Sequence, residues 1–231
     1  MSGVRACIVD LDGTLVDTLG DFDAALAGML AALGLPPAPR EHIARWVGKG
    51  SENLIHQALT HARQAHGAAA SEVTAADVRA AWPLYQQAYL RVNGQHSRVY
   101  EGAADGLRAL QAAGLPLACL TNKPLAFARP LLAAKGLDGF FSHVFGGDSF
   151  ARKKPDPLPL VETCKVLGTA PAHTLMVGDS SNDARAARAA GCPLALVRYG
   201  YNHGEPVEQV GADVLLNALT ELPGWLARHD K

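Results

Sequence analysis

Short apolar runs that alternate with helical segments limit the folds open to this chain. In a parallel sheet covered by helices, each strand is buried on two sides and a helix joins it to the next, so the strands are short and apolar. The sequence therefore predicts an α/β fold with a parallel sheet. The expected strands are Val4–Val9, Leu117–Leu120, His143–Phe145, Leu175–Val177, Leu194–Val197 and Asp213–Leu215. The expected helices between them are Ala103–Ala113, Pro124–Lys135, Asp156–Leu167 and Asn182–Ala190.

A long helical segment, from about residue 20 to residue 92, interrupts this alternation after the first expected strand. Apolar residues recur in it at helical spacing, and the prolines of Leu35–Pro39 end its first helix. We expect residues 19–94 to form a small inserted α-helical domain. Residues 1–18 and 95–231 then form the core domain, with the insertion placed over the edge of the sheet where ligands bind.

Composition limits the classes of binding partner and the cellular compartment that we expect for this protein. The 231-residue chain has a net charge of -1 and no basic stripe, so we do not expect nucleic acid or an anionic membrane surface as a partner. No apolar run is long enough to span a bilayer, and the few residues before the first strand leave no room for a signal peptide. The four cysteines form no CxxC pair, which favours buried reduced thiols. We expect a cytoplasmic protein, either a monomer or a homodimer.

Polar residues stand where the expected strands end, or just before a helix. Because the carboxyl ends of parallel strands meet at one edge of a sheet, we expect these side chains to lie close together. Burying several carboxylates there is unfavourable unless a cation or another partner neutralises them. The residues are Asp10 and Asp12, Thr121 and Asn122, Lys154, and Asp179 and Asp183.

This set suits phosphoryl transfer. A carboxylate nucleophile divides the hydrolysis of a phosphate monoester into two easier steps, and a second acid protonates the leaving alcohol and later activates water. A lysine and a divalent cation offset the repulsion between the nucleophile and the phosphate, and Mg²⁺ prefers carboxylate oxygens. Thr121 and nearby backbone N–H groups can hold the phosphoryl oxygens.

Each segment alone also has a simpler interpretation. Asp12-Gly13 is ordinary turn chemistry, Thr121-Asn122 is compatible with a helix cap, and Asp183 would stabilise a helix N-terminus. A calcium-binding EF-hand loop at Asp10 is excluded, because Gly13 stands at the fourth position of such a loop and the loop needs glycine at the sixth. Their joint order along the chain, each near a strand end, favours a reaction centre.

Taken together, these motifs resemble those of the haloacid dehalogenase-like hydrolase superfamily. The resemblance covers nearly the whole chain and implies a Rossmann-like three-layer core with a small helical cap inserted after the first motif. The four motifs are Asp10-Leu11-Asp12-Gly13-Thr14, Thr121-Asn122, Lys154-Pro155, and Gly178-Asp179-Ser180-Ser181-Asn182-Asp183.

The resemblance also implies a role for each motif residue. Asp10 would be the nucleophile that becomes phosphorylated, Asp12 the general acid and base, and Lys154 the group that stabilises the charge of the nucleophile and the phosphate. Phosphoryl binding would fall to Thr121 and Asn122. The ligands of Mg²⁺ would be Asp179, Asp10, the backbone carbonyl of Asp12, and Asp183 directly or through water.

Within the superfamily, the chain is most similar to the phosphoglycolate phosphatase family. The similarity lies in Leu15–Thr18, in Trp46–Gly50 and in Tyr199–Asn202, with Thr18 standing where that family commonly has serine. Gly48 and Lys49 are then expected to face the substrate, a small phosphorylated metabolite.

Several alternatives stay open. The first is a sugar-phosphate phosphatase or a phosphomutase on the same scaffold, and a non-catalytic phosphate-binding module is less favoured because the acidic residues and Lys154 are all present. A phosphonatase would use a cap lysine such as Lys49 to form a Schiff base. Asp12 argues against a dehalogenase, which does not need an acid there.

Overall fold

A six-stranded parallel sheet forms the centre of the molecule, as predicted. The computed structural model describes residues 3–65 and 72–229. The strands follow the order β5-β4-β1-β6-β7-β8, so that β1 lies in the middle between β4 and β6. The strands are β1 (Ala6–Val9), β4 (Leu117–Leu120), β5 (His143–Phe145), β6 (Thr174–Gly178), β7 (Leu194–Val197) and β8 (Val214–Leu216).

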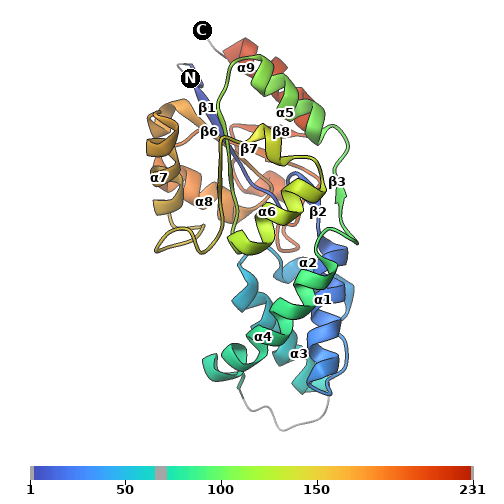
Figure 1. Ribbon diagram of the computed structural model, residues 1–231. Helices are drawn as coiled ribbons and strands as arrows, with labels where there is room; N and C mark the ends of the chain where they lie inside the picture. Colours follow the sequence, from blue (N-terminus) through green and yellow to red (C-terminus); the bar gives the residue numbers. More distant parts are fainter. Residues whose placement is uncertain (1–2, 66–71, 230–231) are drawn as a thin grey trace.

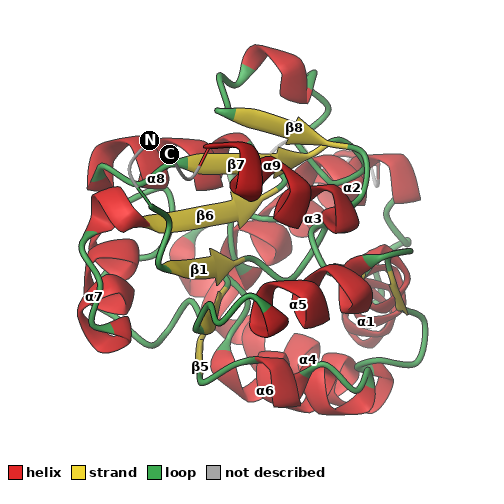
Figure 2. Ribbon diagram, turned by 90° about the horizontal axis from the view of Figure 1, so that it is seen from above, coloured by secondary structure: helices red, strands yellow, loops and turns green. Residues whose placement is uncertain are grey.

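Helices cover both faces of this sheet (Figure 2). Side chains of a strand alternate between the two faces, and in β1 Cys7 and Val9 join one apolar cluster whereas Ile8 joins another. The first cluster includes residues of α5 (Ala103–Ala112), α6 (Leu125–Ala134) and α9 (Leu222–His229). The second includes residues of α7 (Leu158–Leu167) and α8 (Ser181–Ala190). The three-layer α/β prediction is confirmed.

A group of four helices lies beyond one end of the sheet (Figure 1). These helices are α1 (Leu19–Ala32), α2 (Arg40–Trp46), α3 (Ser51–Ala65) and α4 (Ala75–Val92). They pack around an apolar cluster of their own, which includes Leu26, Ile55 and Tyr85 and is joined from the core by Phe127. We call them the cap helices. The exact division of the chain at residues 18/19 and 94/95 stays a prediction.

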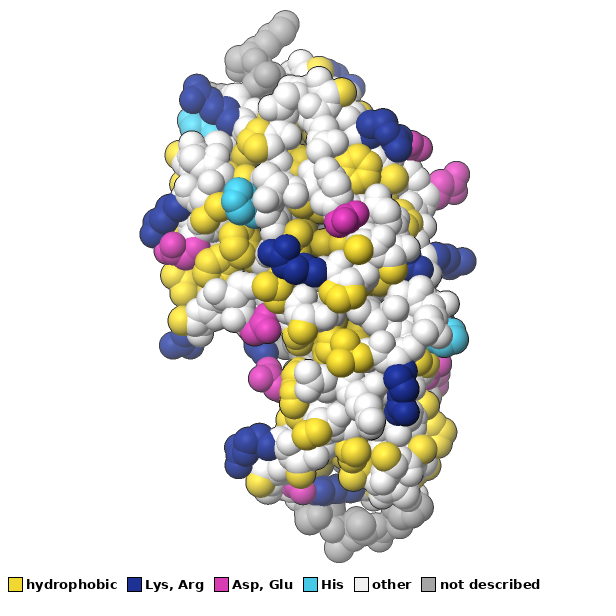
Figure 3. Space-filling model, viewed as in Figure 1, with side chains coloured by type: hydrophobic (Ala, Val, Ile, Leu, Met, Phe, Trp, Pro, Cys, Tyr) yellow, Lys and Arg dark blue, Asp and Glu magenta, His cyan; other side chains and the backbone are white. Residues whose placement is uncertain are grey.

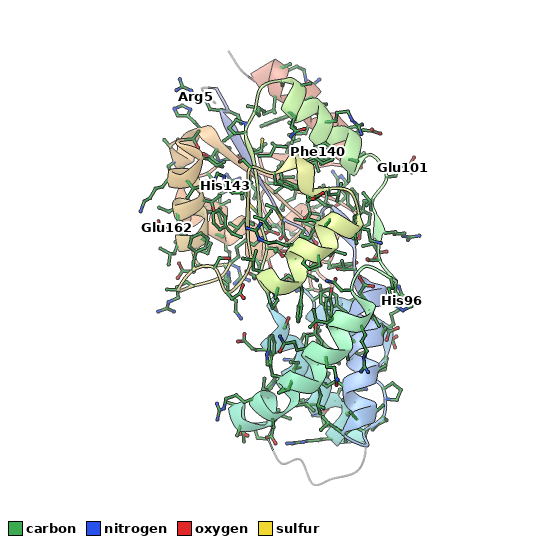
Figure 4. The ribbon with its side chains drawn as sticks, viewed as in Figure 1. Arg5, His96, Glu101, Phe140, His143 and Glu162 are labelled. Carbon is green, nitrogen blue, oxygen red and sulfur yellow. The ribbon has the colours of Figure 1, made fainter. Side chains whose placement is uncertain are left out.

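The chain passes between the core and the cap helices along two segments that are bonded to each other. β2 (Val16–Asp17) and β3 (Arg98–Val99) form a short antiparallel ribbon, which is too short to show in the sequence pattern. Buried Asp21 in α1 accepts hydrogen bonds from the backbone N–H groups of Gly94 at 2.8 Å and His96 at 2.7 Å. Figure 4 shows His96 at this junction.

The surface carries charges of both signs, interspersed on the face seen in Figure 3, and a recess marks the place where the core meets the cap helices. Among the described residues, no helix combines the length and the apolar character that crossing a bilayer requires.

Asp21→Ala should destabilise the protein by about 2 kcal/mol, because it removes a buried carboxylate that accepts two backbone hydrogen bonds. Urea unfolding at neutral pH measures the change. Asp23→Ala is the matched control in the same helix, since Asp23 is only half-buried, and it should change stability by less than about 0.5 kcal/mol. Equal effects of the two substitutions would contradict this account of Asp21.

Candidate active site

Three neighbouring strands deliver most of the predicted site residues to one edge of the sheet, whereas Lys154 comes from the loop after β5 and Gly48 and Lys49 come from the loop after α2. Val9 of β1 is in register with Cys119 of β4 and with Val177 of β6, so the polar residues that follow these strands come out side by side. The backbone continues this register, since Asp10 N–H donates to the carbonyl of Val177 at 2.9 Å. The parallel sheet therefore explains why residues so distant in the sequence meet.

Lys154 connects two of the predicted carboxylates. Its Nζ lies 2.9 Å from Oδ1 of Asp10 and 2.7 Å from Oδ1 of Asp183, and it donates to the carbonyl of Leu120 at 2.8 Å. The ammonium group thus donates hydrogen bonds to Asp183 and to the Leu120 carbonyl, and it forms an ion pair with Asp10. Burial lowers the pKa of Lys154, but the charges and hydrogen bonds of Asp10 and Asp183 outweigh burial and raise it above the ordinary value. Lys154 is therefore a permanent positive charge in this site.

Asp183 is fixed by the start of α8. Its Oδ2 accepts hydrogen bonds from Ser180 N–H at 3.1 Å, from the Ser180 hydroxyl at 2.8 Å and from Asp179 N–H at 3.3 Å. Gly178 lies so close that a Cβ there would stand 2.4 Å from Cγ of Asp183. Asp183 thus stabilises a helix N-terminus, as the simpler interpretation expected, and the same carboxylate offers its other oxygen to Lys154.

Asp179 is held by residues from two other loops. Tyr201 N–H donates to Oδ2 at 2.6 Å, and the Thr14 hydroxyl donates to Oδ1 at 3.2 Å. These two supporting residues were not predicted from the sequence. The only signal for them was their position inside segments that resemble the family, Asp10–Thr14 and Tyr199–Asn202.

Asp10, Asp179 and Asp183 together can hold a cation. One carboxylate oxygen from each lies within 4.8 Å of the others, and all three residues are buried. Burial raises the pKa of Asp10 to about 7; the Lys154 charge opposes this rise and the Asp183 charge adds to it. Burial, followed by the charges of Asp183 and Asp10, raises the pKa of Asp179 well above its ordinary value. A single ammonium does not balance three carboxylates, so this set of hard oxygen ligands fits a divalent cation.

The Asp12 side chain lies outside this cation set and faces a pocket between the core and the cap helices. The core contributes Asp10, Asp12, Thr121, Asn122 and Lys123 to the lining, and the cap helices and their loops contribute Phe22, Val47, Gly48, Gly50, Ser51 and Leu54. The space between these residues that water can occupy is about 20 Å³, which is room for a single water molecule. A substrate therefore needs the pocket to widen.

Two asparagines join the loop after α2 to the core. Asn122 Nδ2 donates to the carbonyls of Gly48 at 2.9 Å and Lys154 at 2.7 Å, and Asn182 Nδ2 donates to the same Gly48 carbonyl at 3.1 Å. Gly48, with φ of +97°, is thus placed at the site, whereas Lys49 is exposed and does not line the pocket. The substrate-binding roles of Thr121, Asn122, Gly48 and Lys49 stay predictions.

Lys123, to which the sequence pattern assigns no role, is among the most buried charges of the site. Its side chain is 1% exposed, and Nζ lies 2.8 Å from Oδ1 of Asp12. The sequence feature that could have pointed to Lys123 is its position directly after Thr121-Asn122. The backbone of this loop is irregular, however, so no periodic pattern shows which of its side chains points inward. Two rings of the cap helices complete its surroundings, those of Phe22 and Tyr89.

Comparison with known proteins identifies the class. The family model described as haloacid dehalogenase-like hydrolase matches residues 4–191. The chain belongs to this family, as the motifs predicted.

Relatives within the family point to a narrower group. The chain is 42% identical over 218 residues to a phosphoglycolate phosphatase of Thiobacillus denitrificans, covering 94% of this chain and 93% of that protein. It is 40% identical over 229 residues to the phosphoglycolate phosphatase of Escherichia coli K12, covering 95% and 91% of the two chains. The crystal structure of a predicted phosphoglycolate phosphatase from Haemophilus somnus superposes with a TM-score of 0.91 at 32% identity, over 97% of this chain and 99% of that one.

The buried Asp10 predicts a pH-dependent stability of the metal-free protein. Its pKa rises from 3.8 when unfolded to about 7 when folded, so the folded state binds the extra proton and the stability this gives is lost as the pH rises between these values. Asp10→Asn removes this titration. Relative to the wild type in EDTA, it should therefore be more favourable at pH 8 than at pH 5 by at least about 1 kcal/mol.

Urea unfolding at the two pH values measures this difference. Asp105→Asn is the control, since the Asp105 side chain is 71% exposed, and its effect should be the same at both. A pH-independent effect of Asp10→Asn would contradict a raised pKa.

Proposed function

We propose that this protein is a phosphatase that hydrolyses a small phosphate monoester, with 2-phosphoglycolate as its preferred substrate and glycolate and phosphate as products. The observation that carries the proposal is the placement of Asp10. It stands at the end of the central strand, 2.9 Å from Lys154 and within the set of three carboxylates. The similarity to phosphoglycolate phosphatases over nearly the full chain supports the choice of substrate.

The first step transfers the phosphoryl group to Asp10. A carboxylate oxygen of Asp10 attacks phosphorus, the bond from phosphorus to the leaving oxygen breaks, and the proton of the Asp12 carboxyl passes to that oxygen to give the alcohol. Lys154 lies against the attacking carboxylate, where its charge offsets the approach of the anionic phosphate. Thr121 stands at the end of β4 and lines the same pocket, where its hydroxyl can hold a phosphoryl oxygen.

The second step releases phosphate. The Asp12 carboxylate takes a proton from water, the water oxygen attacks phosphorus, and the bond between phosphorus and Asp10 breaks. Both steps need Asp12 beside the reacting phosphorus, and Asp12 and Asp10 line one pocket. The two carboxylates therefore have different tasks: Asp10 forms the bond and Asp12 moves the protons.

The proposed cofactor is Mg²⁺. Asp10, Asp179 and Asp183 would hold it together with the backbone carbonyl of Asp12, and Asp183 would act directly or through water. When bound, the ion supplies positive charge that offsets the phosphate and the nucleophile. Lys154 alone leaves the three carboxylates undercompensated, which is the physical reason for proposing a cation there.

The relatives favour a small substrate. The wall of the pocket on the side of the cap helices includes the apolar side chains of Phe22, Val47 and Leu54. Because the relatives that match nearly the whole chain are phosphoglycolate phosphatases, we rank a sugar-phosphate phosphatase or phosphomutase second. We further propose that the protein acts in the cytoplasm, as a monomer or homodimer, without a nucleic acid or membrane partner.

Asp10→Asn should lower phosphate release from 2-phosphoglycolate by roughly 10³-fold or more, because the nucleophile is lost while the shape of the side chain is kept. A phosphate-release panel that also includes hexose and pentose phosphates tests the substrate. The proposal expects the highest kcat/KM for 2-phosphoglycolate, and Asp105→Asn serves as the control. Near-native release by Asp10→Asn would remove this residue from the role of nucleophile.

Chelation should stop turnover, and Mg²⁺ should restore it. Mg²⁺ at about 100 times its Kd should also raise the Tm of the wild type by about 5 °C, because a ligand that binds only the folded state stabilises it. Asp179→Asn should lose most of this increase, and Asp105→Asn should keep it. Turnover that is indifferent to chelation would exclude the proposed metal role.

A further inference from the structure

Lys123 makes contacts that the roles assigned so far do not explain. Its Nζ lies 2.8 Å from Asp12 Oδ1, 4.2 Å from the ring centre of Phe22 in α1 and 4.8 Å from the ring centre of Tyr89 in α4. A lysine in a loop ordinarily extends into water. This one is buried between the core, which supplies the carboxylate, and the cap helices, which supply the two aromatic faces.

The backbone of this loop is also fixed. Lys123 N–H donates to the Thr121 hydroxyl at 3.1 Å, and the Lys123 carbonyl accepts from Gly147 N–H at 2.9 Å. The backbone of Lys123 is therefore held in place, and its ammonium group lies between the two rings and the Asp12 carboxylate. Because an ammonium favours the face of an aromatic ring, the rings hold Nζ where it meets Asp12. The contact occupies Oδ1 of Asp12 and restrains the rotation of its carboxyl group.

We propose that Lys123 is a positioning residue that orients the Asp12 carboxyl group toward the leaving oxygen and the attacking water. This inference rests on the proposed function, since it concerns the two proton transfers of that reaction. Lys123 forms no bond to phosphorus and acts through Asp12. The cap helices contribute through Phe22 and Tyr89, so the orientation of Asp12 is complete only when these helices pack against the core as they do here.

Substrates with different leaving groups separate this role from a general loss of activity. An alkyl phosphate such as 2-phosphoglycolate needs a proton on its leaving oxygen, whereas p-nitrophenolate leaves without one. Since kcat/KM reports only the steps up to release of the alcohol, Lys123→Met should lower kcat/KM for 2-phosphoglycolate by about 10- to 100-fold, and for p-nitrophenyl phosphate by less than about 3-fold. The ratio of the two values in one preparation is independent of the fraction of folded enzyme.

The second proton transfer gives an independent readout. Water must still be activated to release phosphate from Asp10, whichever alcohol has left. Lys123→Met should therefore lower kcat for p-nitrophenyl phosphate and produce a burst of p-nitrophenol before the steady state, as the phosphorylated enzyme accumulates. The control is Lys165→Met, in which an exposed lysine paired with Glu162 is removed, and it should leave the substrate ratio and the burst as in the wild type.

A double-mutant cycle decides whether Lys123 acts through Asp12. In the Asp12→Asn background, Lys123→Met should change kcat/KM for 2-phosphoglycolate by less than about 3-fold, because the amide at position 12 has no acidic proton to transfer to the leaving oxygen. Two outcomes would each overturn the proposal. The first is full additivity of the Asp12→Asn and Lys123→Met effects on kcat/KM, and the second is a ratio of the two substrates' kcat/KM values that Lys123→Met leaves unchanged. A wild type that hydrolyses neither substrate would instead overturn the proposed function, so the two failures are distinguishable.

Discussion

The ammonium group of Lys154 is the contact on which the rest of the site depends. It meets carboxylates from two different strand ends, Asp10 after β1 and Asp183 in α8 after β6, and a carbonyl from the end of β4. Breaking a buried ion pair by removing one partner is strongly unfavourable. The three segments that carry the chemistry are therefore held together by a single charge that the solvent does not reach.

The surrounding structure supports this charge cluster by close packing. Gly178 leaves the space that Asp183 occupies, and the Asp183 carboxylate serves both the helix start and Lys154. Thr14 and Tyr201 fix Asp179 from outside. Such positioned groups require little reorganisation when charge develops in a reaction, which is the condition for effective electrostatic stabilisation.

The sequence was informative where periodicity and strand ends decide the structure. The parallel sheet, the strand His143–Phe145 and the convergence of Asp10, Asp179, Asp183 and Lys154 follow from apolar patterning, because the ends of parallel strands share one edge. The inward turn of Lys123 could not be predicted. It depends on two rings from α1 and α4 that are distant in the sequence, and on a loop backbone with no periodic signal. The β2–β3 ribbon was not predicted for a related reason, since each of its strands has two residues, which are too few to form a periodic pattern.

The chain leaves the core at Val16 and returns to it at Val99, and this arrangement affects how such a protein can diversify. These two residues face each other in the ribbon, so the segment that carries all four cap helices leaves and re-enters the core at one place. The six-stranded sheet continues without interruption on the other side of that point. An ancestral core could therefore exchange the whole segment, or vary its length, while the reactive edge stayed unchanged. Selectivity and chemistry can then evolve on separate parts of one polypeptide.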